Sequence, residues 1–386
     1  MNIQEKDKEY IANTYGRFPV TLVSGKGARV KDENGKEYID LGTGIAVNAF
    51  GVGDSEWIEA VTAQLGKIQH TSNLFYSQPC ADLAELLCKR TGMKKVFFSN
   101  SGAEANETAV KVARKYAAEK KGAEYNTVIT LKNSFHGRTI SMLAATGQDV
   151  FHKDFLPLTE GFVYAEPNNC EDVKKLVGEN KVAAIMFETV QGEGGVLPLE
   201  KSFVDTLVEI AEKEDILLIV DEVQTGNGRS GALYNYMNYG ITPDIVTTAK
   251  GIGGGLPLGV AMLGEKVKDT LKPGDHGSTF GGNPVACAGA LSIISRIDDK
   301  LLSEVREKSE YIFKAFEGAQ GVKSVSGAGL MIGIECEKDV GEILSLCRDK
   351  GVIAIKAKNK VRLLPPLNIE WSDLKKAVDV LLEAMA

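Results

Sequence analysis

Residues 216–224, Ile-Leu-Leu-Ile-Val-Asp-Glu-Val-Gln, decide the fold of this chain. Five consecutive aliphatic residues predict a strand that is buried on both faces, as in a parallel sheet covered by helices. Asp221 follows directly, and its charge must leave the core and find a cation or a hydrogen-bond donor. Ligands of open parallel sheets bind beyond the carboxyl ends of the strands, so Asp221 and Gln224 are candidate site residues.

The alternation of strand, loop and helix extends to both sides of this segment. It predicts helices at 57–65 and 81–90, a long helix that ends near residue 120, and further strands at 95–98, 127–131, 183–187 and 245–248. Such alternation is typical of an α/β fold with a mostly parallel central sheet flanked by helices.

The two ends of the chain have a different texture. An alternating stretch from 20 to 41, around Asp32-Glu33-Asn34-Gly35, predicts a hairpin. After Pro284, the pattern predicts long helices at about 285–316, 339–350 and 371–385 and short strands at 329–335 and 352–355. We therefore expect a large domain at 42–283 and a smaller α+β domain assembled from 1–41 and 284–386.

Composition excludes several classes of protein. The chain has 386 residues, 44% of them hydrophobic, and 45 basic against 52 acidic residues, a net charge of −7. It is too apolar for a disordered protein, and it lacks the basic excess that would neutralise nucleic-acid phosphates. No segment predicts a secretory signal or a membrane span, and six scattered cysteines indicate reduced thiols of a cytoplasmic protein. Four histidines without an HExxH motif predict no metal site.

Three other segments carry candidate chemistry at strand ends. Ser101-Gly102-Ala103 opens a helix, whose N-terminus suits an anion such as phosphate. Lys250 follows a strand among small residues, so its amine can be desolvated and used as a nucleophile. Phe135-His136-Gly137-Arg138 suits a flat ligand that carries a carboxylate. Each segment alone has an ordinary structural explanation, as a helix cap, a surface lysine or a packed loop.

Together the four segments match the requirements of pyridoxal 5′-phosphate (PLP). A lysine makes the Schiff base with this cofactor, and a carboxylate keeps the pyridine nitrogen protonated so that the ring acts as an electron sink. The combination therefore predicts a PLP site.

Nearly the whole chain resembles the class-III PLP-dependent aminotransferases (subgroup II, fold type I). The stretches that carry the resemblance are 44–48, 72–76, 99–107, 133–139, 144–148, 191–195, 221–231, 247–259 and 276–284. Ser-Asn-Leu-Phe-Tyr at 72–76 and Phe-His-Gly-Arg-Thr at 135–139 point to the acetylornithine group of the family. The resemblance implies a ping-pong transfer of the terminal amino group of N-acetylornithine to 2-oxoglutarate, in arginine biosynthesis.

The resemblance also implies roles toward the cofactor. Lys250 would form the Schiff base and move the proton, Asp221 would hold the pyridine nitrogen protonated, and Gln224 would bond the phenolic oxygen. Phe135 would stack on the ring. The remaining implied contacts come from His136, Glu188 and Val223, from Ser101, Gly102 and Ala103 at the phosphate, and from Ser278 and Thr279. Thr279 would reach the cofactor phosphate of the partner subunit in a homodimer.

Substrate roles follow from the same resemblance. Arg138 would hold the carboxylate that lies far from the reacting amine in acetylornithine and the side-chain carboxylate of glutamate. Arg362 would hold the α-carboxylate of glutamate, and Glu193 would pair with Arg362 when no carboxylate is there. Tyr15 would line the substrate entrance. Arg362 as a strand-edge charge and Glu193 as an exposed loop acid are the alternatives.

Two stretches depart from the family pattern, and other activities stay open. Thr189 stands where the family usually has proline, and residues 51–55, Gly-Val-Gly-Asp-Ser, replace Gly-His-x-His-Pro. The donor could be ornithine, succinylornithine, 4-aminobutyrate or a carrier-linked lysine, or the enzyme could be an aminomutase. A nucleotide-dependent oxidoreductase is suggested only by Gly327 to Gly333, whose spacing GxGxxxG differs from the GxGxxG fingerprint.

Overall fold

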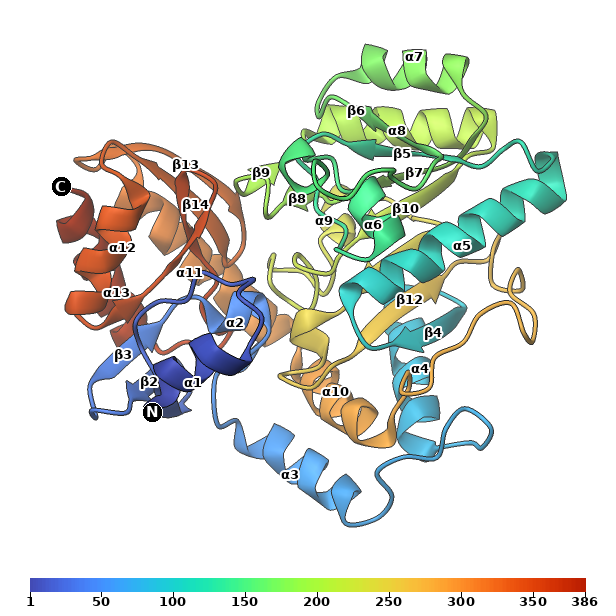
Figure 1. Ribbon diagram of the computed structural model, residues 1–386. Helices are drawn as coiled ribbons and strands as arrows, with labels where there is room; N and C mark the ends of the chain where they lie inside the picture. The colour runs from blue at the N-terminus through green and yellow to red at the C-terminus, as the bar shows by residue number, and fades with distance from the viewer.

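The computed structural model describes residues 1–386. Figure 1 shows two bodies, one built around a long central sheet and the other containing both ends of the chain. No helix has the length and apolar character needed to cross a bilayer.

Seven strands form the central sheet, in the order β4-β12-β11-β10-β7-β5-β6. They are β4 (Lys95–Ser99), β5 (Thr127–Leu131), β6 (Phe162–Ala165), β7 (Val182–Phe187), β10 (Leu217–Asp221), β11 (Ile245–Thr248) and β12 (Gly259–Leu263). Only β12 is antiparallel to its neighbours, which confirms the prediction of a mostly parallel sheet. Every residue of β7 and β10 is buried, because helices cover both faces of the sheet.

Several helices surround this sheet. They are α3 (Ser55–Leu65), α4 (Gln78–Thr91), α5 (Gly102–Lys121), α6 (Ile140–Ala145), α7 (Cys170–Glu179), α8 (Lys201–Glu214) and α9 (Tyr236–Tyr239). α5 packs along β4, β7 and β10 to β12, and it buries a stripe of alanine and valine. Two short strands, β8 (Val190–Gln191) and β9 (Leu197–Pro198), pair in the loop after β7.

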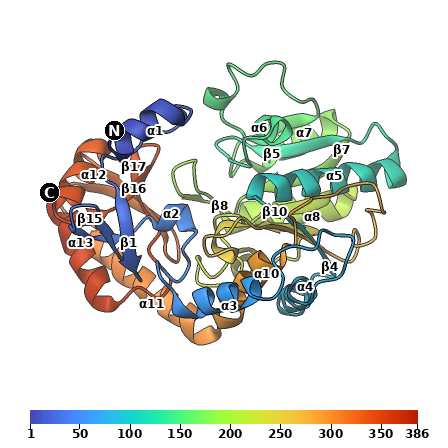
Figure 2. The same ribbon diagram turned by 60° about the horizontal axis from the view of Figure 1, so that its bottom comes forward.

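The predicted single helix over 285–316 is wrong. The structure has two helices instead, α10 (Pro284–Arg296) and α11 (Asp299–Phe316). The break occurs because the Asp298 carboxylate caps α11, accepting a hydrogen bond from the backbone N–H of Leu301 at 2.8 Å. α10 packs against α3 and α4, beside the central sheet (Figure 2).

The second body has two four-stranded sheets. One is a meander of β1 (Leu22–Lys26), β2 (Arg29–Asp32) and β3 (Glu37–Asp40), and β3 also pairs in parallel with β15 (Val352–Ile353). The other contains β13 (Val322–Ala328), β14 (Met331–Cys336), β17 (Lys360–Leu363) and β16 (Ile355–Ala357), in that order. α11, α12 (Val340–Asp349) and α13 (Trp371–Met385) complete this body.

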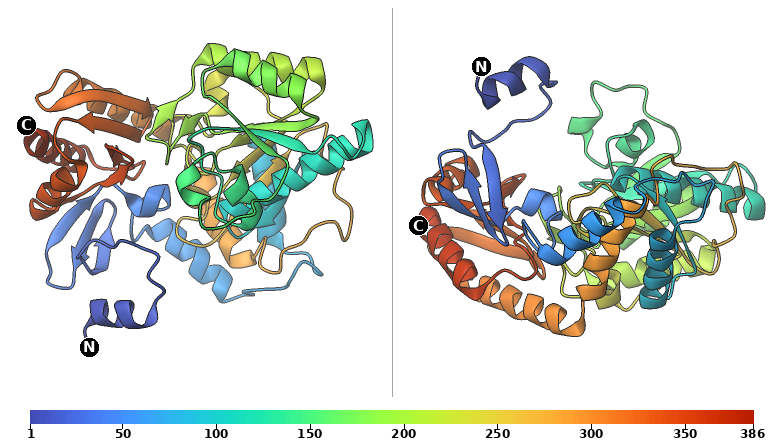
Figure 3. Two further views of the ribbon diagram at one scale, coloured as in Figure 1. Left: turned by 45° about the horizontal axis from the view of Figure 1, so that its top comes forward. Right: turned by 90° about the horizontal axis from the view of Figure 1, so that it is seen from below.

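The pairing of β3 with β15 joins the N-terminal meander to the C-terminal part of the chain, and Figure 3 shows the blue meander beside the orange and red elements. The division of the chain at residues 42 and 284 stays a prediction, since α10 lies with the central sheet although it begins at Pro284. Two short helices, α1 (Ile3–Tyr10) and α2 (Thr43–Ala46), flank the meander in the sequence. The stretch from Gly327 to Gly333 lies in the β13–β14 hairpin, not between a strand and a helix as dinucleotide binding requires.

The unusual stretch at 51–55 has a structural explanation. A side chain at Gly51, whose φ is 80°, would place Cβ 2.4 Å from the carbonyl oxygen of Gly27, so only glycine fits. Asp54 forms a two-fold ion pair with Arg296 of α10, with Oδ1 at 3.0 Å from Nη1. The Arg296 guanidinium also lies 4.1 Å from the centre of the Phe50 ring. The stretch therefore joins α3 to α10.

Candidate active site

A cavity of about 470 Å³ lies beyond the carboxyl ends of β5, β7, β10 and β11. It gathers most of the candidate residues from segments far apart in the sequence. Those that line it are Ser101, Gly102, Ala103, Phe135, His136, Arg138, Glu188, Asp221, Val223, Gln224 and Lys250. The topology of the sheet thus brings all four candidate segments to one place.

Asp221 is buried at the end of β10 and receives three hydrogen bonds. Its Oδ1 accepts from the backbone N–H of Val223 at 2.9 Å, and its Oδ2 accepts from His136 Nδ1 and Asn106 Nδ2, both at 2.8 Å. His136 must carry a proton on Nδ1 to donate to this carboxylate. These donors fix the orientation of the carboxylate, which can then accept a hydrogen bond from a protonated ring nitrogen.

Lys250 follows β11 in a strained backbone conformation. Its φ is 50°, a left-handed value that costs a non-glycine residue on the order of 1–3 kcal/mol and is typical of functional sites. Burial lowers the pKa of the Lys250 amine, although the nearby Glu193 charge acts in the opposite direction. A lowered pKa leaves more of the amine unprotonated and therefore nucleophilic.

The start of α5 lies directly against Val223. Ser101 caps the helix, its Oγ accepting from the backbone N–H of Glu104 at 3.2 Å. A Cβ at Gly102 would lie only 2.6 Å from Val223 Cγ1, so glycine is required for this close approach. The first N–H groups of a helix have no partner within it, and together with the helix dipole they suit a phosphate.

Glu188 joins two loops that line the cavity. Its carboxylate accepts from the backbone N–H of Phe135 at 2.9 Å and of Gly192 at 3.4 Å. Burial raises the pKa of Glu188 to about 7, although the nearby His136 lowers it. The Phe135 ring packs edge-on against Phe151, with centroids 5.9 Å apart, so Glu188 and Phe151 fix its position.

Arg362, Glu193 and Gln224 form a connected cluster. Arg362 lies on β17 and is buried, and its Nη1 donates to Glu193 Oε1 at 2.6 Å and to Gln224 Oε1 at 3.1 Å. Gln224 Nε2 in turn lies 3.3 Å from Glu193 Oε1. Burial raises the pKa of Glu193, but the Arg362 charge and hydrogen bond outweigh it and hold the pKa below its ordinary value. The cluster is therefore an ion pair.

The two remaining substrate-binding candidates, Arg138 and Tyr15, differ in their position relative to the cavity. Arg138 is exposed, and its guanidinium lies 4.5 Å from the centre of the Phe151 ring. Tyr15 is exposed and lies outside the cavity lining, with the Arg17 guanidinium over its ring at 5.2 Å. The chain alone does not bring Tyr15 to the cavity.

Ser278 and Thr279 also lie outside the lining. Ser278 Oγ accepts from Asn100 Nδ2 at 3.2 Å and from the backbone N–H of Gly281 at 2.9 Å. Thr279 is exposed. Asn100 lines the cavity, so its hydrogen bond to Ser278 anchors this loop at the edge of the cavity. The Thr279 side chain forms no hydrogen bond within its own chain.

Sequence reasoning missed Asn106 and Thr247. Thr247 Oγ1 donates to Asn106 Oδ1 at 2.6 Å, and Asn106 contacts Asp221. A signal existed, because Asn106 stands three and seven residues before Ala109 and Ala113, on the apolar face of α5. A polar side chain on such a face needs a buried partner.

Thr189, where the family usually has proline, is buried, and its Oγ1 accepts from Asn235 Nδ2 at 2.9 Å.

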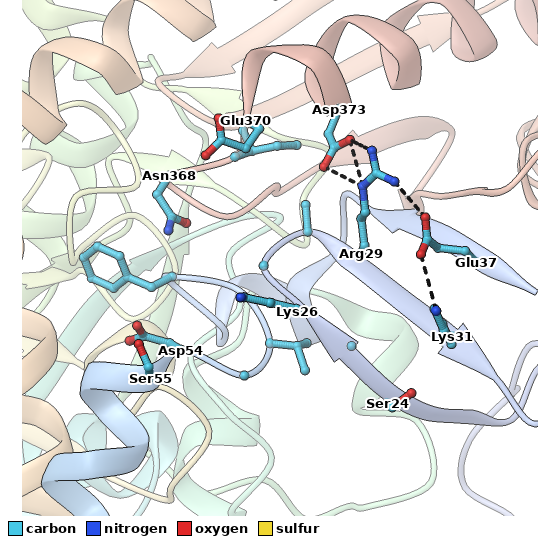
Figure 4. A pocket seen from close by; sticks show the side chains of 17 residues that line it. Ser24, Lys26, Arg29, Lys31, Glu37, Asp54, Ser55, Asn368, Glu370 and Asp373 are labelled. Atoms are coloured by element: carbon cyan, nitrogen blue, oxygen red, sulfur yellow. Dashed lines mark hydrogen bonds and ion pairs between the residues drawn. The ribbon is translucent and has the colours of Figure 1, made fainter. Parts of the chain in front are cut away.

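A second cavity, of about 680 Å³, lies between the meander, the start of α3 and the start of α13. Figure 4 shows Arg29 paired with Asp373 and Glu37, and Lys31 with Glu37, while Lys26, Glu370 and Asp54 are drawn without a partner among the residues shown. Arg29 donates to Asp373 at 2.6 Å and to Glu37 at 2.8 Å, and Lys31 lies 3.9 Å from Glu37. Lys26 of this cavity is exposed, whereas burial lowers the pKa of Lys250 in the first cavity, so the chemistry belongs to the cavity of Lys250 and Asp221. No group of three or more His, Cys, Asp or Glu side chains converges as a metal site would require.

Residues 10–385 match the model of the family Aminotransferase class-III. The chain therefore belongs to the class-III aminotransferases, which are PLP-dependent transaminases of fold type I. It is 48% identical to the acetylornithine aminotransferase of Haemophilus ducreyi, over all of this chain and 98% of that protein.

The solved structures that resemble this chain include aminotransferases. The N-acetylornithine aminotransferase of Stenotrophomonas maltophilia is 34% identical, with a TM-score of 0.85 over 98% of this chain and 97% of that one. An ornithine aminotransferase of Toxoplasma gondii, with PLP at partial occupancy in its active site, is 30% identical, with a TM-score of 0.94 over 99% and 93%.

The residues present fit PLP. Gly102 lets the start of α5 approach Val223 closely, the first turn of this helix offers N–H donors for a phosphate, and Asp221 offers a carboxylate for the ring nitrogen. Lys250 supplies the amine, and Phe135 and Val223 supply apolar faces for a flat ring. The donor set of the cavity thus has one partner for each functional group of the cofactor.

Proposed function

We propose that this protein transfers the terminal amino group of N-acetylornithine to 2-oxoglutarate, in arginine biosynthesis and in the cytoplasm. The observation that carries the proposal is the Arg362–Glu193 ion pair beside Gln224. Such a pair can serve two substrates that differ by one carboxylate. The names and identities of the relatives support the same donor.

PLP, when bound, supplies a carbonyl that condenses with amines and a ring that accepts the electrons released at the substrate carbon. The chain's own residues provide the rest. Lys250 offers its amine to the cofactor and, once released, carries a proton between substrate and cofactor carbons. Asp221 holds the proton on the ring nitrogen, and Gln224 bonds the phenolic oxygen. The start of α5 with Ser101, Gly102 and Ala103 binds the phosphate.

Charge selects the two substrates in turn. Arg138 binds the carboxylate that lies far from the reacting amine, which both substrates possess. Glutamate also has a carboxylate next to its reacting carbon, and Arg362 binds it after Glu193 has moved away. With acetylornithine no such carboxylate is present, and Glu193 keeps the buried Arg362 paired. Tyr15 lines the entrance in this arrangement.

A homodimer completes the site in this proposal. Leu74, Phe75 and Tyr76 are exposed, and Asn73 Nδ2 donates to the carbonyl oxygens of Ser278 and Gly281 at 2.9 and 3.0 Å. These two segments therefore lie side by side and form an exposed apolar surface together with Phe280. If a second copy covers this surface, Thr279 of one subunit would reach the cofactor phosphate of the other.

One experiment tests the substrate assignment. Purified protein loaded with PLP is mixed separately with acetylornithine, ornithine, succinylornithine, 4-aminobutyrate and glutamate, and the loss of visible cofactor absorbance is followed. We expect acetylornithine and glutamate to react fastest. If free ornithine or 4-aminobutyrate exceeds acetylornithine by about tenfold in kcat/KM, a difference of about 1.4 kcal/mol, the donor is wrong. Lys250→Ala serves as the control and should lose the covalent link that borohydride otherwise traps.

A further inference from the structure

We propose that Asn106 and Thr247 are positioning residues that orient Asp221 toward the ring nitrogen of the cofactor. The inference rests on the proposed function, because it assigns these two residues to the same site. Neither residue was given a role by the sequence analysis, and only Asn106 lines the cavity.

The orientation of the Asn106 amide is fixed by its partners. Its Nδ2 donates to the carbonyl oxygen of His136 at 2.8 Å, and a carbonyl oxygen can only accept. The second hydrogen on Nδ2 is then directed at Asp221 Oδ2, at 2.8 Å. Oδ1 is left as the acceptor, and it receives the hydroxyl of Thr247 at 2.6 Å. Both N–H groups of the Asn106 amide therefore donate and its oxygen accepts, so the amide has only one possible orientation.

The partners of Asn106 stand on rigid elements. Asp221 of β10 and Thr247 of β11 are opposite each other in the parallel register, and both are buried. Asn106 reaches them from α5, which packs on the same strands. Side chains held by helices and strands are more precisely placed than side chains on loops.

This geometry has a consequence for the carboxylate. Oδ2 of Asp221 is engaged by Asn106 and His136, whereas Oδ1 accepts only from the backbone N–H of Val223. Oδ1 is thus the oxygen with accepting capacity left for a protonated ring nitrogen. One helix then holds both ends of the cofactor, since Asn106 follows Gly102 by about 6 Å along α5.

The test compares Asn106→Ala, Thr247→Val and Thr247→Ser with the wild type and with Val112→Ala. Val112 is buried on the same helix, and its truncation creates a cavity without removing a hydrogen bond. Each protein is loaded with PLP labelled with ¹⁵N in the ring, and its nitrogen resonance, its affinity for PLP, its half-reaction rate with glutamate and its melting temperature are measured.

We expect Asn106→Ala to shift the nitrogen resonance toward the unprotonated form and to slow the half-reaction by about 10- to 100-fold, the effect of losing one hydrogen bond to a charged group. Thr247→Val should change the nitrogen resonance and the half-reaction rate in the same direction but by less. Thr247→Ser should keep the resonance of wild type and a rate within about twofold of it. Val112→Ala should lower the melting temperature without moving the resonance.

Two results would overturn the inference. One is an Asn106→Ala protein whose nitrogen stays protonated and whose rate lies within about twofold of wild type. The other is a Val112→Ala protein that shows the same shift as Asn106→Ala, because the effect would then be general loosening of α5. If Asn106→Ala does not fold, the Thr247→Val and Thr247→Ser pair decides. A wild type that binds no PLP would instead overturn the proposed function, and this outcome is visible before any variant is compared.

Discussion

Arg362 Nη1 lies 2.6 Å from Glu193 Oε1, and the two side chains come from different bodies of the molecule. Arg362 is buried, so it needs a negative partner whether the partner belongs to the protein or to the substrate. The pair therefore couples the charge of the substrate to the position of a loop.

The first prediction concerns Glu193→Gln. This change removes the negative partner of Arg362, and we expect kcat/KM of the acetylornithine half-reaction to fall about tenfold or more, because an unpaired buried cation would face an apolar chain. The glutamate half-reaction, which brings its own carboxylate, should change by less than about threefold. Single-turnover rates with each substrate measure both effects. Equal losses with the two substrates, or a matching loss of PLP affinity, would contradict the gate.

The second prediction concerns Gly102→Ala. The new Cβ would lie 2.6 Å from Val223 Cγ1, and a branched valine cannot turn away from it. We expect the start of α5 to be displaced and the affinity for PLP to fall by about tenfold or more, measured by fluorescence titration. Val223→Ala makes room for the methyl group, so adding Gly102→Ala to Val223→Ala should cost much less affinity than adding it to wild type. Additive losses would show that the clash is not the cause.

The third prediction concerns the pH dependence of stability. Glu222 is buried beside Asp221 without a basic partner, accepting from the backbone N–H of Tyr236 at 2.6 Å and the Thr225 hydroxyl at 2.5 Å. Burial raises the pKa of Glu222 from 4.5 to about 7. The folded protein therefore binds this proton more tightly than the unfolded chain. The resulting stability is complete below pH 4.5 and is lost as the pH rises through 7, about 3 kcal/mol in total.

Glu222→Gln should remove this loss. A glutamine can accept from Tyr236 with its oxygen and donate to Thr225 with its nitrogen, so both hydrogen bonds survive. We expect the melting temperature of the variant to exceed that of wild type above about pH 7 and to approach it near about pH 5. Melting curves that run parallel across this range would mean that Glu222 does not titrate there. Glu188 should leave a residual slope, because its pKa is also raised to about 7.

The fourth prediction concerns the junction of α3 and α10. Asp54→Ala removes the two-fold ion pair with Arg296, in which both side chains are largely buried. We expect the free energy of unfolding to fall by about 1–3 kcal/mol while kcat stays near wild type. Glu56→Ala is the matched control, since Glu56 lies 3.6 Å from the same guanidinium but is exposed, and it should cost less than about 0.5 kcal/mol. Chemical denaturation measures both, and equal costs would contradict this account.

Some of the fold could be predicted from local sequence. The strands at 95–99, 127–131, 182–187, 217–221 and 245–248 each contain a short apolar run, and the predicted bounds lie within one residue of the observed bounds at either end. The break between α10 and α11 was missed, because Ile297 continues the apolar pattern and only the capping role of Asp298 ends it.

The candidate site could be predicted only in part. Residues next to strand ends, such as Asp221 and Lys250, can be recognised from the sequence because they follow a predicted strand. Asn106 and Thr247 sit inside regular elements, and their contact with each other depends on how α5 packs across the sheet. Local patterns do not contain that information, since the packing is set by tertiary contacts.

The parallel pairing of β3 with β15 makes the order of synthesis matter. The seven strands of the central sheet are complete once residue 263 has left the ribosome, whereas the N-terminal meander waits for a partner made almost last. Until then β3 has an unpaired edge, which other chains could pair with. Exposure of β15 is therefore the event that closes this edge, and a chain interrupted before β15 would be left with an unpaired strand edge in its meander.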